Sequence, residues 1–234
     1  MQITLIGHST ILIETAGKRV LTDPFWNTWG NPAFARVGTP AKTREEMADV
    51  DAVLVSHDHW DHVDAKYFKM CGSTPIFAPF PASAMIKLMG GKTVSNINTG
   101  TTFAVGEVKI TVVPAVHLTH SVGYILQSEG KTIYFAGDTF YNGFMLKLGK
   151  DYQIDAALMP VTTFRIPMTM NEAGALKAAR TLYPSVILPI HLGLNPRSPL
   201  MRTGDSADHF ARLVEAEKLP VRVVQLQNGE TFSM

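Results

Sequence analysis

Cysteine is almost absent from this 234-residue chain, which has Cys71 alone. A single cysteine excludes an intramolecular disulfide framework and suits a reducing compartment, so we expect a cytoplasmic protein. No apolar run reaches the roughly 18 residues that a membrane span needs. The first residues, Met1 to Ile6, lack the basic stretch of a signal peptide and are typical of a first strand.

An excess of one charge is also missing. Lys and Arg number 21 and Asp and Glu number 20, so no bulk positive field favours nucleic acid as a partner. Apolar residues make up 46% of the chain, which is enough for a sizeable core and excludes disorder as the main state. Because no linker or low-complexity stretch divides the chain, we expect one domain over residues 1–234.

The hydrophobic pattern predicts a mixed α/β protein. Strands are expected over residues 2–6, 10–15, 19–22, 51–56, 107–114, 121–127, 131–136, 154–159, 185–190 and 221–226. Helices are expected from the residues after His62 to about 70, and over 82–89, 171–182 (with Asn171 as N-cap) and 207–217.

An internal repeat links the two halves of the chain. His8 to Asp23 and His120 to Asp138 share one order: His-Ser, apolar strand, Gly-Lys, apolar strand, Asp. Each half also contains an apolar strand that ends in histidine, at His57 and at His191. Two similar half-units facing each other would bring these strand ends to one site, although short strand–turn–strand units can also look alike by chance.

The most informative segment is 56–62, Ser-His-Asp-His-Trp-Asp-His, which directly follows an apolar strand. Imidazole and carboxylate are suitable ligands for zinc, manganese or iron. In an extended loop alternate residues face the same way, so His57 and His59 can hold one ion. Asp61 and His62 point to a second position nearby. The alternative is a solvated polar loop that caps a helix.

Three more candidate ligands follow apolar strands one at a time: His117, Asp138 and His191. Each alone would more often be a satisfied polar residue at a strand end. Together with the loop they supply five histidines and two aspartates, which suit two metal ions that share a bridging ligand.

The chain has the motif His-x-His-x-Asp-His at 57–62, together with His117, Gly137-Asp138-Thr139 and Pro189-Ile190-His191. With these motifs it resembles the metallo-β-lactamase-fold hydrolases over essentially its whole length. This resemblance implies a four-layer αββα sandwich of two facing halves. It also implies that His57, His59 and His117 hold metal one, that Asp61, His62 and His191 hold metal two, and that Asp138 bridges them.

Two branches of that superfamily share further motifs with the chain. Residues 5–9 and 21–25 look like the branch that contains L-ascorbate-6-phosphate lactonase. Residues 53–64 are similar to the N-acylphosphatidylethanolamine phospholipase D group. Relatives commonly have a Gly-containing stretch where this chain reads Val-Thr-Thr-Phe-Arg at 161–165, so substrate cannot be copied from either branch.

Substitutions within the motifs exclude other chemistries. His59 in place of Glu argues against the di-iron, oxygen-reducing members that resemble this fold. Cys71 lies outside every motif, which argues against a cysteine-ligated site, and we expect it to be a buried small apolar residue.

Asp61 and His120 are the candidates for proton transfer. A carboxylate that holds metal with one oxygen can accept a proton with the other, as we expect of Asp61. His120, three residues after His117, is a candidate proton donor to the leaving group or a substrate contact, with a surface position as the alternative. Asp23 is a candidate hydrogen-bond partner of a metal-bound imidazole, with a plain turn residue as the alternative. His8 is a candidate to support the metal ligands or to contact substrate, with a plain turn histidine as the alternative.

Four basic residues could meet an anionic substrate or could be plain surface charges: Arg165, Lys147, Arg197 and Arg202. The loop over 24–36 carries Phe25, Trp26, Trp29 and Phe34. It is expected to form an apolar wall over the metals or to anchor itself to the core, and it could serve as an oligomer interface.

The sequence thus predicts a metal-dependent hydrolase with two divalent ions, Zn²⁺ or Mn²⁺, with Fe as a further option. Its substrate is expected to be a small lactone, ester or phosphorylated molecule, most specifically a sugar-phosphate lactone. The alternatives are a phosphodiesterase acting on a phospholipid or a cyclic nucleotide, and a metal-binding regulator without activity.

Overall fold

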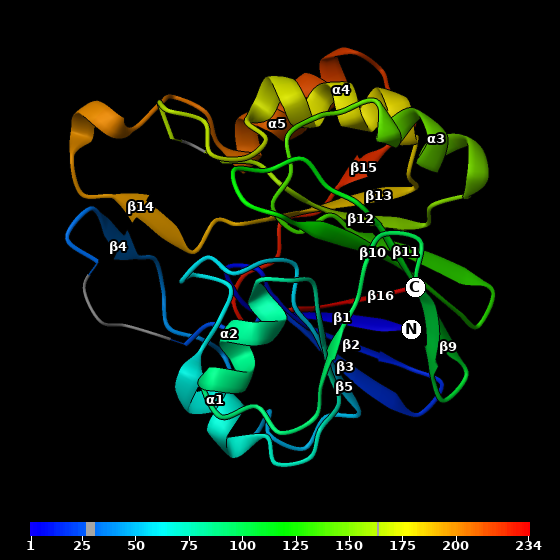
Figure 1. Cartoon of the computed structure of the whole chain (residues 1–234). Coiled ribbons are helices and arrows are strands. Elements are labelled where there is room, and N and C mark those ends of the chain that lie inside the picture. Colours follow the sequence, from blue (N-terminus) through cyan, green and yellow to red (C-terminus); the bar gives the residue numbers. More distant parts are fainter. Residues whose placement is uncertain (27–30, 163) are drawn as a thin grey trace.

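Two seven-stranded β-sheets lie face to face in the computed structural model, and helices cover both outer faces (Figure 1). The structure describes residues 1–26, 31–162 and 164–234. Trp29 and Thr163, which belong to segments singled out in the sequence, lie outside the described residues.

The first sheet has the strand order β16-β1-β2-β3-β5-β6-β7. Its strands are β1 (Gln2–Gly7), β2 (Thr10–Thr15), β3 (Lys18–Thr22), β5 (Ala52–Leu54), β6 (Ile76–Ala78), β7 (Val94–Asn96) and β16 (Thr231–Ser233). Helices α1 (Ala65–Met70) and α2 (Ala82–Leu88) pack on its outer face.

The second sheet has the order β15-β13-β12-β11-β10-β9-β8. Its strands are β8 (Thr102–Val105), β9 (Val108–Pro114), β10 (Val122–Ser128), β11 (Lys131–Phe135), β12 (Ala156–Pro160), β13 (Val186–Ile190) and β15 (Arg222–Val223). Helices α3 (Phe144–Asp151), α4 (Glu172–Leu182) and α5 (Ala207–Ala216) cover it.

The two sheets repeat one topology. In each, three antiparallel strands, β1 to β3 and β9 to β11, are followed by parallel strands, β5 to β7 and β12, β13 and β15. The predicted αββα sandwich of two similar halves is therefore confirmed.

Apolar side chains from the two inner faces form the central core, with separate clusters beneath each helical layer. Tyr124 lies fully buried between the sheets and donates its hydroxyl to the carbonyl of Val55 at 2.7 Å. Cys71 is buried in the cluster beneath α1 and α2, as a small apolar residue was expected to be. Asn171 caps α4 as predicted, because its side chain accepts a hydrogen bond from the backbone of Gly174.

Several elements were not predicted. The strands β6, β7, β8 and β16 have three or four residues each, too few for a clear alternation. Helix α3 contains Gly149, a poor helix former, where a Cβ would clash with the carbonyl oxygen of Thr181. The strand expected over 221–226 is wrong in length, since only Arg222 and Val223 pair with β13.

A third, two-stranded sheet joins the two halves at one side of the molecule (Figure 1, left). It pairs β4 (Phe34–Arg36) with β14 (Leu194–Pro196), which come from loops 160 residues apart, and the 3₁₀ turn η1 (Pro199–Met201) follows β14. This small sheet lies beside the strand ends that carry the polar motifs. Within the described ranges, no helix combines the length and apolar character needed to cross a membrane.

Candidate metal centre

The polar motifs all follow strands at the same edge of the sandwich. Strands β1, β3 and β5 run in one direction within the first sheet, and β9, β11 and β13 do so within the second. Carboxyl ends of such strands meet at one edge, where open α/β sheets bind ligands. The residues that follow them are His8, Asp23, the 57–62 loop, His117, Asp138 and His191.

In the described part of the chain, three overlapping groups bring ligand atoms within 4.8 Å of one another. They are His57, His59 and His117; His57, His62 and Asp138; and His8, Asp61, His62 and His191. All seven residues that the sequence proposes as metal ligands are thus brought together, and His8 joins them.

The first group fits one tetrahedral ion. Nδ1 of His59 lies 3.1 Å from Nε2 of His117. Two ligands on a tetrahedral zinc, each at 2.0–2.1 Å, are separated by about 3.3 Å. The 3.1 Å contact can be a hydrogen bond between the two rings, and the same spacing also suits two ligands of one cation.

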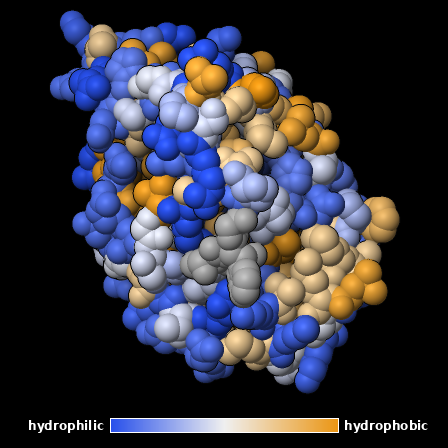
Figure 2. Space-filling model, turned by 90° about the vertical axis from the view of Figure 1, so that its left-hand side faces the viewer, coloured by the Kyte–Doolittle hydropathy of each residue, from blue (hydrophilic) through white to orange (hydrophobic). Residues whose placement is uncertain are grey.

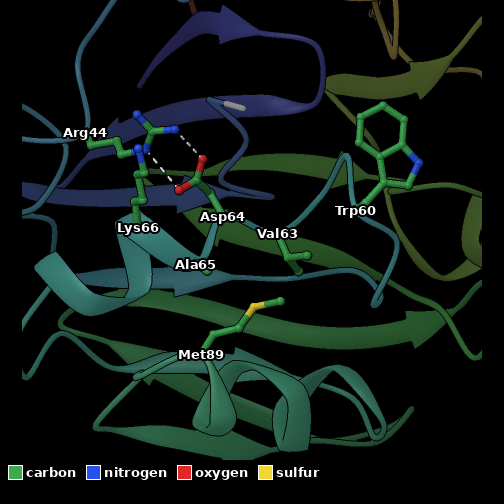
Figure 3. A pocket seen from close by; sticks show the side chains of 7 residues that line it. All are labelled: Arg44, Trp60, Val63, Asp64, Ala65, Lys66 and Met89. Atoms are coloured by element: carbon green, nitrogen blue, oxygen red, sulfur yellow. Dashed lines mark hydrogen bonds and ion pairs between the residues drawn. The ribbon is translucent and has the colours of Figure 1, made fainter. Parts of the chain in front are cut away.

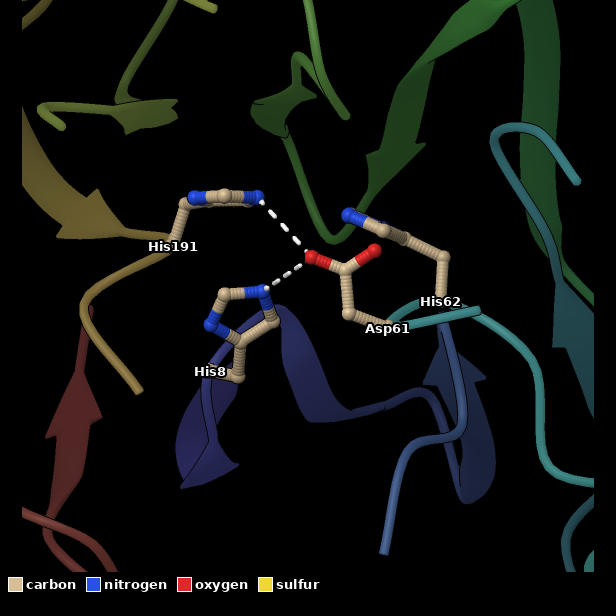
Figure 4. Close-up of side chains that lie close together, drawn as sticks. All are labelled: His8, Asp61, His62 and His191. Carbon is tan, nitrogen blue, oxygen red and sulfur yellow. Dashed lines mark ion pairs between the residues drawn. The ribbon is translucent and has the colours of Figure 1, made fainter. Parts of the chain in front are cut away.

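The group of His8, Asp61, His62 and His191 surrounds the carboxylate of Asp61 (Figure 4). Nε2 of His191 lies 3.5 Å from Oδ2 of Asp61 and 3.1 Å from Oδ2 of Asp138. Asp138 also approaches the first group, because Oδ2 of Asp138 lies 3.8 Å from Nε2 of His117. Its other oxygen, Oδ1, lies 3.5 Å from Nε2 of His62. Its carboxylate therefore lies between the two groups, where a bridging ligand would be.

Atoms aimed into the cluster have no hydrogen-bond partner among the described residues. They are buried and include Nε2 of His57, Nε2 of His62, Nε2 of His191 and Oδ1 of Asp138. Each unsatisfied buried polar atom costs about 1–3 kcal/mol, so a cluster of them needs a compensating group. Divalent cations satisfy imidazole nitrogen and carboxylate oxygen together, and the donor set fits them.

Asp23 orients two of these imidazoles from behind. Its carboxylate accepts hydrogen bonds from the backbone and hydroxyl of Ser56 and from Nδ1 of His62, each at 2.7 Å. Because the Ser56 hydroxyl donates to Asp23, it accepts from Nδ1 of His57 at 2.9 Å. In the neutral rings these contacts place the proton on Nδ1, so the lone pair of each Nε2 faces the cluster.

His8 has the opposite hydrogen-bond pattern. The backbone N–H of Gly193 donates to its Nδ1 at 3.1 Å, so the neutral ring carries its proton on Nε2. That nitrogen lies 3.3 Å from Oδ2 of Asp61. Gly193 allows this approach because a Cβ there would come within 2.7 Å of the His8 Cβ.

Burial and neighbouring charges divide the histidines into two sets. Burial, reinforced by nearby imidazoles, lowers the pKa of His8 to about 3 and the pKa of His57 well below its usual value. Burial likewise lowers the pKa of His117 to about 4. Burial alone would also lower the pKa of His191, but Asp138 and Asp61 raise it to about 9. Against the same effect of burial, Asp138, Asp23 and Asp61 raise the pKa of His62 well above its usual range.

The other predicted site residues lie outside the cluster. His120 is exposed, and its Nδ1 donates to the carbonyl of Phe80 at 2.8 Å. Arg165 is exposed, with its backbone N–H bonded to the carbonyl of Met201. The remaining cations have partners away from the cluster: Lys147 with Asp151, Arg197 with the carbonyl of Asn31, and Arg202 with the carbonyl of Pro196.

A pocket opens directly over the cluster. Five of its ten lining residues belong to the cluster: His59, Asp61, His117, Asp138 and His191. The other five are apolar: Phe34, Trp60, Phe164, Met168 and Leu194. Phe34 from the early loop thus joins the apolar wall that the sequence predicted, whereas Trp26 stacks on Tyr67 and anchors the loop. Trp60 and Phe164 lie in segments that the sequence singled out, 56–62 and 161–165, but no role was expected of these two side chains. The sequence did not single out Met168 or Leu194, because they come from separate segments.

A second hollow lies at the start of α1 (Figure 3). Its cations are Arg44 and Lys66, and Arg44 makes two hydrogen bonds to Asp64, at 2.9 and 2.7 Å. None of the clustered histidines lines it. Among the described residues, the pocket over the cluster is lined by five of the seven proposed ligands, and this hollow by none of them.

Comparison with known proteins agrees with this geometry. Residues 18–192 match the beta-lactamase superfamily domain. The chain is 33% identical to a "UPF0173 metal-dependent hydrolase" of Methanopyrus kandleri, covering 99% of each chain. It is 32% identical to another from Archaeoglobus fulgidus, covering 99% of this chain and 98% of that one. A solved structure, a novel metallo hydrolase from Ignicoccus hospitalis, is 25% identical with a TM-score of 0.80, covering 100% and 98% of the two chains.

Proposed function

Because the chain belongs to the family defined by the beta-lactamase superfamily domain, we propose that it is a metal-dependent hydrolase with a two-metal centre. Its proposed substrate is a small lactone, ester or phosphorylated molecule. One observation carries the proposal: seven His and Asp side chains converge beneath a pocket with buried ligand atoms that lack partners among the described residues.

His57, His59 and His117 would hold one ion, Asp61, His62 and His191 the other, and Asp138 would bridge them. When bound, two divalent ions lower the pKa of water from ~15.7 towards ~7 and stabilise the oxygen that becomes anionic during hydrolysis. The nitrogen and oxygen ligands suit Zn²⁺, Mn²⁺ or Fe.

Asp61 is proposed to accept a proton from the attacking water. Its carboxylate lies at the pocket lining, and His8 and His191 both approach its Oδ2. Burial raises the pKa of this carboxyl on its own, but His62 and the contacts from His191 and His8 bring the pKa well below its usual value. Asp61 therefore starts the reaction ionised, which is the state that a base needs.

His8 is proposed to position Asp61 and not to bind metal. Its Nδ1 accepts the Gly193 N–H, so Nε2 keeps the proton and can donate only towards a carboxylate. A metal ligand needs an unshared lone pair on the nitrogen that faces the ion. His8 differs in this way from His57 and His62.

His120 remains our candidate for protonating the leaving group. A carbonyl can only accept, so the bond to Phe80 places a proton on Nδ1 of His120. Donation from its Nε2 therefore requires the charged ring, and the side chain must reach the pocket from its exposed position.

Resemblances to two branches of the superfamily favour two particular kinds of hydrolase. The motifs at 5–9 and 21–25 favour a lactonase, and the motif at 53–64 favours a phosphodiesterase as the second candidate. A regulator without activity is disfavoured, because structural metal sites seldom have bridging carboxylates beneath an open pocket. The single cysteine leads us to propose a cytoplasmic location.

The test is hydrolysis of a panel by the purified protein: γ-butyrolactone, p-nitrophenyl esters and bis-p-nitrophenyl phosphate. We expect turnover of at least one class, loss after chelation, and recovery with Zn²⁺ or Mn²⁺. Metal-loaded protein that hydrolyses none of the three classes would contradict the proposed function.

A further inference from the structure

The substrate that the pocket accepts is decided by the five apolar residues over the cluster, which we call the collar: Phe34, Trp60, Phe164, Met168 and Leu194. We propose that the collar binds a neutral, apolar substituent next to the scissile bond, so that the substrate is an ester or lactone carrying an aliphatic or aromatic group. This inference rests on the proposed function and narrows its substrate class.

The collar is assembled from distant parts of the chain. Phe34 comes from β4 and Leu194 from the facing strand β14, so the small third sheet builds two sides of it. The ring of Phe34 lies 5.1 Å from that of Phe164 and 6.4 Å from that of Trp60. These aromatic contacts hold the collar as a continuous apolar wall.

The wall continues to the ligands below and to the surface above. Phe164 lies 6.2 Å from the ring of His191, in edge-to-face orientation. Outside it, Ile166 and Leu200 are exposed on two segments joined by the hydrogen bond between Arg165 and Met201. Figure 2 shows apolar patches interspersed with hydrophilic surface on this side of the molecule. A substrate would thus meet the apolar collar directly above the cluster.

No Lys or Arg lines the pocket itself. Cations lie outside it: Arg44 and Lys66 in the hollow that also contains Trp60, and the exposed Arg165 beside Ile166. The residues outside the described ranges, Asn27 to Gly30 and Thr163, are uncharged, whatever their placement. Ions held by the cluster would supply positive charge at the scissile bond only, and a second anion on the substrate would lose its hydration against the collar without a partner. A phosphate or carboxylate away from the reacting group is therefore disfavoured.

Chain-length dependence tests the apolar part. We expect kcat/KM of the metal-loaded protein to rise at least tenfold from p-nitrophenyl acetate to p-nitrophenyl octanoate. Phe34→Ala and Phe164→Ala should reduce that gain to less than threefold. Phe103→Ala is the matched control, since Phe103 is a half-buried phenylalanine stacked on Phe77 away from the cluster, and it should keep the full gain. A flat dependence in the wild-type protein would overturn the inference.

Charge preference is tested with gluconolactone and its 6-phosphate. We expect the neutral lactone to have the higher kcat/KM, by at least tenfold. Met168→Lys should raise the relative kcat/KM of the phosphate at least tenfold, whereas Met168→Gln should not. A wild-type preference for the phosphorylated lactone would overturn the inference while leaving the hydrolase itself intact.

Binding separates this inference from the proposed function. We expect octanamide to bind at least tenfold more tightly than butanamide in calorimetry, with the difference lost in Phe34→Ala and kept in Phe103→Ala. If this holds while none of the lactones, esters and phosphodiesters is hydrolysed, the proposed function fails, whereas binding of an apolar group by the collar stands. Equal binding of the two amides would overturn the collar inference whether or not esters are hydrolysed.

Discussion

The backbone N–H of Gly193 donates a hydrogen bond to Nδ1 of His8 at 3.1 Å. This bond joins the first strand of one half to the loop after β13 of the other half. It also decides the protonation of the His8 ring, because an acceptor Nδ1 leaves the proton on Nε2, opposite Asp61. One backbone contact thus distinguishes His8, which can donate from Nε2, from the proposed metal ligands around it.

Substitution of His8 tests this distinction. His8 has a left-handed backbone with φ of 61°, which Asn tolerates better than most residues, so His8→Asn is the suitable variant. We expect about 10–100-fold lower kcat, the range for lost support around a metal site, with both ions retained. Metal content by mass spectrometry and kcat are measured together. Loss of one ion per chain would show that His8 is a ligand.

Asp23→Asn tests the support behind His57 and His62. An amide accepts fewer hydrogen bonds than a carboxylate, so the ring orientations lose their restraint and metal affinity should fall about 10–100-fold. Competition with a chromophoric chelator measures it. Asp51→Asn is the control, because Asp51 also accepts a backbone N–H and a side-chain bond but lies away from the cluster. Equal effects of the two substitutions would contradict the role of Asp23.

Asp61→Asn tests the proposed base. The amide cannot take a proton from water at neutral pH, and general bases contribute roughly 10²–10⁴-fold, so kcat should fall by at least about 100-fold. The measurement is kcat at matched metal occupancy. If the variant keeps both ions and near-wild-type turnover, Asp61 is not the base.

The role of His120 is tested by the leaving group. If it donates a proton to the departing oxygen, His120→Gln should slow alkyl esters by about 100-fold. The same variant should slow p-nitrophenyl esters less than about threefold, because p-nitrophenolate leaves without a proton. Equal effects on both ester classes would remove His120 from the mechanism.

Much of the cluster could be predicted because its signals are local. A buried strand followed at once by His57, His59, Asp61 and His62 is visible in one window of sequence. The repeat from His8 to Asp23 is visible too, because each half is a continuous strand–turn–strand unit. The sheets then bring these strand ends together, as the repeated topology required.

Apart from Phe34, the collar could not be predicted, because its residues become neighbours only through tertiary contacts. Phe34 and Leu194 meet through a two-stranded sheet whose strands have three residues each, below the length at which alternation is informative. The position of Gly193 against His8 joins residues 185 apart in sequence. The basic residues proposed for an anionic substrate illustrate the same limit, since the local sequence around Arg165 does not show that its side chain lies outside the pocket.

The central claim is that hydrolysis depends on two ions held by the clustered residues. The most direct measurement is titration of chelator-treated protein with Zn²⁺ or Mn²⁺, following bound metal per chain and the rate of hydrolysis of one substrate together. The account predicts negligible rate without metal and a rate that saturates at about two ions per chain. A full rate in the chelated protein, or saturation at one ion, would contradict it.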